Sequence, residues 1–155
     1  MPRDMPVSDV MVTDLVTIGP DAGVLDAAKL MAEHAVGGLP VVADDGTLVG
    51  LIEEGDVIVE DADLPQRSYI EFLGAYIELP SGLHRFEDRF RKAVAATVAD
   101  AMRSDPPTVA PDTRLEDVAT YMLDHGVGRL PIVDDAGGLV GIVTRGDLVR
   151  AIAAG

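Results

Sequence analysis

The chain has 155 residues, and its 27 acidic side chains outnumber its 12 basic ones, giving a formal net charge of -15 at pH 7. Apolar residues make up 48% of the sequence, which predicts a folded chain long enough to bury one ordinary core or two small ones. So negative a charge argues against nucleic acid as a partner, because contacts to phosphates supply most of that affinity. There is no apolar run of membrane-spanning length, no signal-peptide core at the start and no cysteine for disulfides or thiolate metal sites. We therefore expect a soluble, cytoplasmic protein with no membrane partner.

Two copies of one pattern fill most of the chain. Residues 7–57 align without a gap on residues 98–148, and 23 of the 51 aligned positions are identical. VGGLPVVADDGTLVGLIEEGDV in the first copy meets VGRLPIVDDAGGLVGIVTRGDL in the second. Duplication of this kind predicts a repeat architecture. The expected parts are a first repeat at 1–60, a connector at 61–97 and a second repeat at 98–155, together forming one pseudo-twofold module.

Each repeat is predicted to follow the order strand, helix, strand, strand, helix after a short leading helical turn. Apolar residues at helical spacing mark the long helix, and two apolar runs joined by turn residues mark a hairpin. In the first repeat the elements are a turn at 7–11, a strand at 16–18, a helix from Val24, the hairpin LPVVA-DDGT-LVGLI and a helix near Gly55-Asp56. In the second repeat they are a turn at 98–102, a strand at Thr108-Val109, a helix from Leu115, the hairpin LPIVD-DAGG-LVGIV and a helix near Gly146-Asp147.

Residues at the ends of the long helices predict where they stop and start. Thr113 and Glu116 have the spacing of a capping box at the start of the second-repeat helix. Glycines are typical of helix C-termini. We therefore expect the first helix to end at Gly37 and the second at Gly126 or Gly128.

The connector differs from the repeats in composition. Five of the six aromatic residues of the chain lie in it: Tyr69, Phe72, Tyr76, Phe86 and Phe90. Their spacing predicts two amphipathic helices separated at Pro80-Ser81-Gly82. This much apolar surface predicts a homodimer contact, while burial against the chain's own repeats is the alternative.

The doubled motif h-P-h-h-D…G…h-h-G-h-h-x-x-x-D, with h for an apolar residue, resembles the CBS-domain pair, or Bateman module. The resemblance covers both repeats, and the connector resembles a helical insertion of some stand-alone bacterial pairs. It implies an α+β fold in which two three-stranded sheets pack together with helices outside. It also implies association into a homodimer and clefts between the repeats for adenosine-containing ligands such as AMP, ADP, ATP or S-adenosylmethionine.

By this resemblance, the second repeat carries the ribose- and phosphate-binding segment of the family as GIVTRGD, with Thr144, Arg145 and Asp147. A carboxylate can accept hydrogen bonds from both ribose hydroxyls, and a hydroxyl with backbone N–H groups at a helix start suits a phosphate. A capping box between Thr144 and Asp147 accounts for the same spacing and does not exclude the ligand role. Family analogy adds the charge of Arg129 and a base pocket at Leu130, Pro131, Thr108 and Val109.

The first repeat departs from this pattern. Its segment GLIEEGD keeps Asp56, but Glu53 replaces the hydroxyl residue, Glu54 replaces the arginine and Gly38 stands in place of Arg129. Two added carboxylates repel a phosphate unless a cation lies between them. We expect Asp56 to belong to a weaker site, where an uncharged adenosyl group or a magnesium-bridged phosphate stays open.

Other chemistry is not indicated. His34 and His125 occupy equivalent helix C-termini, where the helix dipole favours histidine, so we interpret them as structural rather than as metal ligands. The sequence has no GxxxxGK[ST], HExxH or GxSxG motif and suggests no catalytic residue.

The favoured function is therefore a regulatory module that binds an adenine nucleotide, needs no cofactor, has no catalytic activity and acts through an unknown effector protein or its own assembly. The alternative is a dimerisation or interaction scaffold with degenerate ligand sites, which the Glu53-Glu54 pair favours.

Overall fold

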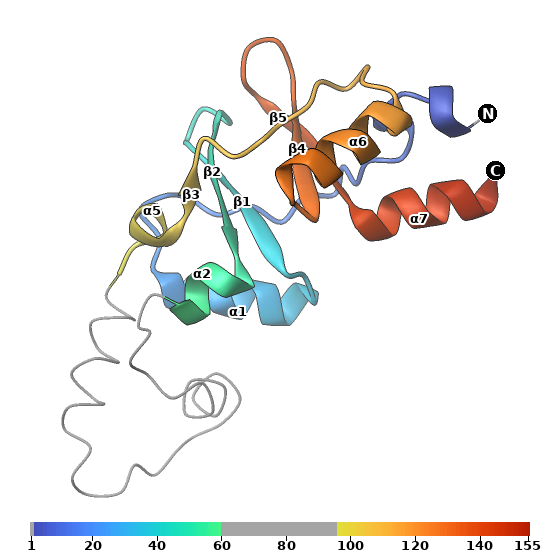
Figure 1. Cartoon of the computed structure of the whole chain (residues 1–155). Helices are drawn as coiled ribbons and strands as arrows, with labels where there is room; N and C mark the ends of the chain where they lie inside the picture. The colour runs from blue at the N-terminus through green and yellow to red at the C-terminus, as the bar shows by residue number, and fades with distance from the viewer. Residues whose placement is uncertain (1, 60–95) are drawn as a thin grey trace, which may run out of the picture. The chain divides into compact units, whose positions relative to one another are not determined.

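The computed structural model describes residues 2–59 and 96–155 (Figure 1). The aromatic connector helices predicted within 61–97 lie outside the described residues. The described parts mix helices with two small sheets, which confirms the predicted α+β class. None of the described helices is long and apolar enough to span a membrane.

The long helices and the hairpins form where the sequence predicts them. In the first repeat the elements are η1 (Pro2–Asp4), η2 (Val7–Asp9), α1 (Val24–His34), β1 (Gly38–Val42), β2 (Leu48–Glu53) and α2 (Glu54–Val59). In the second repeat they are α5 (Val98–Ala101), β3 (Arg103–Ser104), α6 (Leu115–His125), β4 (Arg129–Val133), β5 (Leu139–Thr144) and α7 (Arg145–Ala154). Gly46 and Gly137 take positive φ angles of 87° and 83°, which lets each hairpin turn tightly.

The first strand of each repeat is shorter than predicted. Ile18 makes a single parallel bridge to Val41, and Val109 makes the equivalent bridge to Ile132. The sheets are a three-stranded one in the order β1-β2-β3 and a two-stranded one of β4 and β5, instead of two three-stranded sheets.

The described chain divides into two compact units that are not the two contiguous repeats. Of the described residues, unit 1 comprises 2–15, 42–48 and 105–155, and unit 2 comprises 16–41, 49–59 and 96–104. The segment that leads into each repeat therefore folds in the unit that contains most of the other repeat. The chain passes between the units at Leu15-Val16 and at Ser104-Asp105, as well as on either side of the first hairpin tip.

Hydrogen bonds hold each leading segment in place, and those of unit 1 recur in unit 2 with every residue number raised or lowered by 91. In unit 1 the backbone bonds run from Leu115 N to Met5 O at 2.9 Å, from Val7 N to Thr113 O at 2.7 Å and from Ser8 N to Pro111 O at 3.0 Å. In unit 2 they run from Val24 N to Ala96 O at 3.0 Å, from Val98 N to Ala22 O at 2.8 Å and from Ala99 N to Pro20 O at 2.9 Å.

The cores show the same exchange of leading segments between the two repeats. Val7 is fully buried in unit 1 together with Leu130 and Ile132 of the second repeat. Val98 is fully buried in unit 2 together with Leu39 of the first repeat. Because apolar burial is the main favourable term in folding, each leading segment contributes to the stability of the other repeat's core.

The predicted capping box of Thr113 and Glu116 is wrong. Helix α6 begins at Leu115 after Arg114, whose side chain makes no capping hydrogen bond. Thr113 instead belongs to a turn, donating its N–H to Ala110 O and accepting from Val7 N, so the helix starts later. The first helical N–H, that of Leu115, is bonded by the exchanged segment rather than by a side chain.

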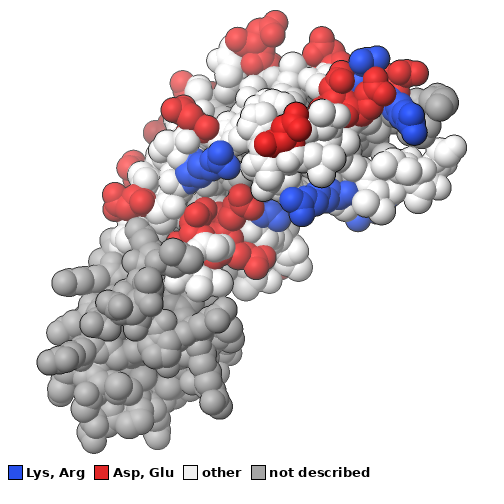
Figure 2. Space-filling model, viewed as in Figure 1, with Lys and Arg blue, Asp and Glu red and all other residues white. Residues whose placement is uncertain are grey.

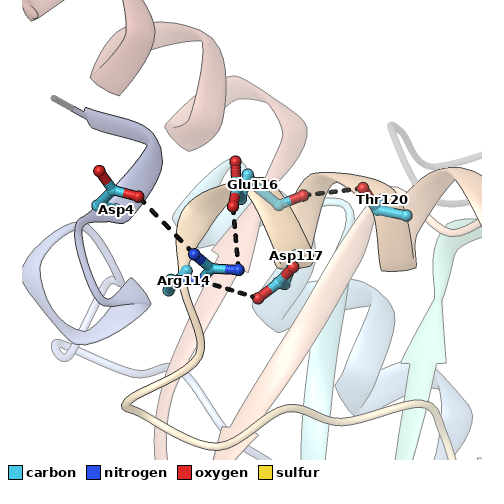
Figure 3. A network of polar contacts seen from close by, with 5 residues as sticks. All are labelled: Asp4, Arg114, Glu116, Asp117 and Thr120. Atoms are coloured by element: carbon cyan, nitrogen blue, oxygen red, sulfur yellow. Dashed lines mark hydrogen bonds and ion pairs between the residues drawn. The ribbon is translucent and has the colours of Figure 1, made fainter.

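Arg114 instead binds acidic side chains around the start of α6 (Figure 3). Its guanidinium lies 3.0 Å from Glu116, 3.2 Å from Asp117 and 3.8 Å from Asp4 of η1. The hydrogen bond to Asp117 is the main cause of the raised pKa of Arg114. These side chains are exposed, so the ion pairs link η1 to α6 locally and contribute little to stability.

Helix α1 ends at a residue other than the predicted Gly37. Its C-cap is Ala35 in the left-handed region, at φ 52° and ψ 44°, whereas α6 ends at Gly126 with φ 63°. Gly126 is thus confirmed as a helix end. Gly37 and Gly128 accept hydrogen bonds from Glu54 N and Arg145 N, the first residues of α2 and α7.

Substitution of Ala35 by Gly is expected to stabilise the protein. A left-handed backbone costs a non-glycine residue about 1–2 kcal/mol, part of which is offset by the greater freedom of glycine in the unfolded chain. We expect Ala35→Gly to raise the free energy of unfolding in urea by roughly 0.5–1 kcal/mol. The matched change Gly126→Ala, at the equivalent cap, should lower it by a similar amount, and a loss of stability in both variants would contradict this account.

Candidate functional site

The start of α7 carries the polar residues that the sequence singles out. Thr144 is its N-cap, and its Oγ1 accepts a hydrogen bond from Asp147 N at 3.3 Å. Asp147 Oδ2 accepts in return from Thr144 N at 2.8 Å and from Thr144 Oγ1 at 3.0 Å. The predicted capping box of Thr144 and Asp147 is therefore confirmed.

The Asp147 carboxylate is buried and held by three groups. Its residue is only 8% exposed, and its second oxygen, Oδ1, accepts a hydrogen bond from the Arg150 guanidinium one turn further along α7. Arg150 neutralises the buried charge from the solvent side, since its own side chain is 72% exposed. Each carboxylate oxygen can accept more than one hydrogen bond, so this arrangement fixes the orientation of Asp147 without exhausting its acceptors.

The hairpin brings Arg129 to the same end of the sheet as Thr144. In the antiparallel pair of β4 and β5, Arg129 lies opposite Thr144, and Pro131 lies opposite Ile142. Arg145 follows at once, and its guanidinium atoms lie within 4 Å of the position that a Cβ on Gly128 would occupy. Two arginines therefore flank the N-terminus of α7, where the helix dipole already favours an anion.

The predicted base-pocket residues lie next to one another along the core of unit 1. Val109 N donates to Pro131 O at 3.3 Å, and Val133 N donates to Val109 O at 3.0 Å. Leu130 and Pro131 are fully buried and Val109 is nearly so, whereas Thr108 is half-buried. A base at this place would therefore meet backbone groups and Thr108 before it met the buried side chains.

The first repeat has the same cap with different charges. Asp56 Oδ2 accepts from Glu53 N at 2.8 Å, as Asp147 does from Thr144 N. Glu53 supplies a carboxylate at the hydroxyl position, and Glu54 at the first position of α2 is exposed. Gly38 is buried where the second repeat has Arg129. The backbone frame is thus shared, and the sign of the charge around it is reversed.

His125 makes local contacts. Its Nδ1–H donates to Tyr121 O at 3.0 Å, and its ring stacks on Tyr121 with centroids 3.9 Å apart. Among the described residues, no three of the His, Asp and Glu side chains are grouped so that they could hold a metal ion. Figure 2 shows acidic side chains in several separate places on the drawn face and basic ones in fewer.

Two apolar cavities lie beside helices rather than at the Thr144 segment. One of about 350 Å³ in unit 2 lies between α1 and α2, around Met31 and Val57. The other, of about 370 Å³ in unit 1, lies between α6 and α7, around Leu115 and Leu148, with Arg3 at its edge. Neither cavity was predicted from the sequence, although the small residues Ala28, Ala32 and Ala119 on the helix faces could have indicated them.

Comparison with known proteins identifies the fold. The family model of the CBS domain matches residues 7–63 and 98–154. Protein MJ1426 of Methanocaldococcus jannaschii is 32% identical over 154 residues, which cover 96% of this chain and 91% of that protein. Chloroplastic CBSX2 of Arabidopsis thaliana is 36% identical over 142 residues, 89% of this chain but 58% of that protein. The chain belongs to the CBS domain family, with two copies of the domain.

Solved structures agree with this membership. CBSX2 in complex with AMP has a TM-score of 0.73 at 32% identity, with 96% of each chain covered. The CBS domain of a CBS domain-containing membrane protein from Sphaerobacter thermophilus has a TM-score of 0.75 at 33% identity, covering 96% of this chain and 88% of that one. The resemblance inferred from the doubled motif is confirmed, and one relative of this fold is known with AMP bound.

Proposed function

We propose that the chain is a regulatory module that binds an adenine nucleotide at the start of α7 and catalyses no reaction itself. The observation that carries the proposal is the capping box of Thr144 and Asp147 flanked by Arg129 and Arg145, in a chain 32% identical to an AMP-bound relative. A phosphate would take the backbone N–H groups of the helix start together with the arginine charge. The ribose hydroxyls would donate to the Asp147 carboxylate.

A module without catalytic activity can transmit ligand binding only by changing its contacts with another protein or with a second copy of itself. We infer an effector protein or the module's own assembly as the recipient, with the nucleotide as ligand rather than as a required cofactor. The first-repeat site is proposed to be weak for a plain mononucleotide, because Glu53 and Glu54 stand where Thr144 and Arg145 stand in the second. Magnesium would be needed there for a phosphate to lie beside two carboxylates. The cytoplasmic location stays a prediction.

Removal of Asp147 tests the site, and Asp56 provides the matched control. Asp147→Ala should weaken AMP binding in isothermal titration calorimetry by about 1–3 kcal/mol, the range for a lost hydrogen bond to a charged group. Asp56→Ala removes the equivalent cap of α2 and should leave AMP affinity within about twofold, because it lies at the acidic site.

Two results would contradict this assignment. Equal AMP affinity in Asp147→Ala and the wild type would exclude Asp147 from the site. A wild-type chain that shows no heat and no thermal shift with AMP, ADP, ATP or S-adenosylmethionine, with and without magnesium, would favour the interaction scaffold.

Charge reversal in the first repeat tests why its site is weak. The double change Glu53→Thr with Glu54→Arg restores the second-repeat residues on a frame that already has the Asp56 bond. Nucleotide stoichiometry should rise from about one toward two per chain, because repulsion of the phosphate is removed. A stoichiometry of one in the double variant would mean that something other than charge closes the site. Two nucleotides bound to the wild type would refute the charge argument.

A homodimer is the third part of the proposal. Leu123, Val149 and Ile152 on α6 and α7 are 83%, 64% and 68% exposed, which adds apolar surface to that of the connector sequence. Light scattering at low micromolar concentration should give about twice 16.3 kDa for the wild type. Phe72→Ser with Tyr76→Ser should shift the mass toward the monomer. A lower melting temperature at unchanged mass would place those aromatics within one chain, and a wild-type monomer would end the dimer proposal.

A further inference from the structure

A segment from the other repeat pairs with the edge of the strand that ends at the proposed site. Strand β5 runs from Leu139 to Thr144, and two backbone hydrogen bonds tie it at Ile142 to Val12 of the first repeat's leading segment. Val12 N donates to Ile142 O at 2.8 Å, and Ile142 N donates to Val12 O at 3.0 Å. Ile142 lies two residues before Thr144, so Val12 fixes the backbone immediately ahead of the cap.

A methionine beside Val12 packs onto the same strand. A Cβ built on Gly141 would overlap Met11 Sδ and would lie 2.8 Å from Met11 Cγ. Gly141 is thus the place where the Met11 side chain lies against the strand backbone. In unit 2, the Met102 side chain lies against the backbone at Gly50 in the same way. Leu51 pairs there with Arg103, as Ile142 does with Val12.

We propose that the leading segment 5–12, which belongs in sequence to the first repeat, positions the nucleotide-binding segment of the second, with Met11 as the positioning residue. The inference rests on the proposed function, because it concerns the same site. The Thr144 hydroxyl and the Asp147 carboxylate are held by bonds to each other, and the frame they share is anchored through β5. Loss of the Met11 side chain leaves the face of β5 at Gly141 uncovered, next to the Val12 bonds, and lets that frame shift. Ligand binding, which requires the frame to be in place, therefore tightens segment 5–12 in return.

The sequence duplication supplies a matched control that separates positioning of the site from a general loss of stability. Met11→Ala and Met102→Ala remove the same side chain from equivalent contacts, with Gly141 and with Gly50 respectively. Both variants should therefore have a lower melting temperature. Coupling along a packed contact of this kind changes binding by about 0.5–2 kcal/mol, which corresponds to about two- to thirtyfold. In calorimetry with AMP we expect Met11→Ala to weaken binding by that factor, Met102→Ala to stay within twofold and Met11→Leu, which restores the contact, to recover most of the affinity. Equal losses in the two alanine variants, or none in Met11→Ala, would overturn the proposal.

Hydrogen exchange separates this inference from the proposed function. Without ligand, Met11→Ala should speed amide exchange in residues 141–147 and leave 50–56 unchanged, and Met102→Ala should do the reverse. With AMP, the wild-type amide of Val12 should exchange more slowly, by a larger factor than that of Arg103. A wild type that binds no AMP would end the proposed function, while the ligand-free exchange would still decide whether Met11 positions β5. Two results would overturn the positioning role: exchange in Met11→Ala that rises equally in residues 141–147 and 50–56, or a Val12 amide whose exchange rate does not change when AMP binds.

Discussion

The backbone hydrogen bonds between each leading segment and the other repeat's long helix are the constraint on which the rest depends. The first N–H groups of a helix have no partner within it, and burying them unpaired is costly. Leu115 N is bonded by Met5 O, and Val24 N by Ala96 O, so neither long helix starts without a carbonyl from the segment that leads the other repeat. A repeat of this length buries only enough surface to be marginally stable alone, and each leading segment adds apolar residues to the core of the other repeat.

Residues 91 positions apart show what the two repeats share and what they do not. The cap bond from Glu53 N to Asp56 and that from Thr144 N to Asp147 are both 2.8 Å long, so the backbone frame at the start of α2 and α7 is one design used twice. What differs is the side chains on that frame: a hydroxyl and two arginines at Thr144, Arg145 and Arg129 against carboxylates and a glycine. Duplication therefore preserves the geometry of the site, while substitution sets its charge.

How far the sequence reaches can be judged from particular elements. The hairpins and long helices were predictable because apolar periodicity, turn glycines and the 91-residue repeat all agree on them. The cap at Thr144 was predictable because its two partners are three residues apart, whereas the exchange was not, since its bonds join residues such as Met5 and Leu115 that no local pattern relates. The error at Thr113 has the same origin, because bonds to the leading segment set the start of α6. The error at Gly37 is local, because α1 ends in a left-handed cap at Ala35, where the second repeat has Gly126. At the site, spacing predicted the contact of Thr144 with Asp147, and only the strand register could place Arg129 opposite Thr144.

The capping role of Asp147 supports the ligand role that we propose for it. A carboxylate that is already oriented by Thr144 N, Thr144 Oγ1 and Arg150 loses little conformational freedom when a ligand arrives, and such preorganisation favours affinity. Its 8% exposure also removes it from bulk water, where a hydrogen bond to ribose would compete with solvent. Arg150 keeps the buried charge paired meanwhile, and its exposed side chain can move without disturbing the cap on Oδ2. The residue that caps α7 is thereby held in the orientation that the proposed contact with a nucleotide requires, so the cap and the proposed site share one aspartate.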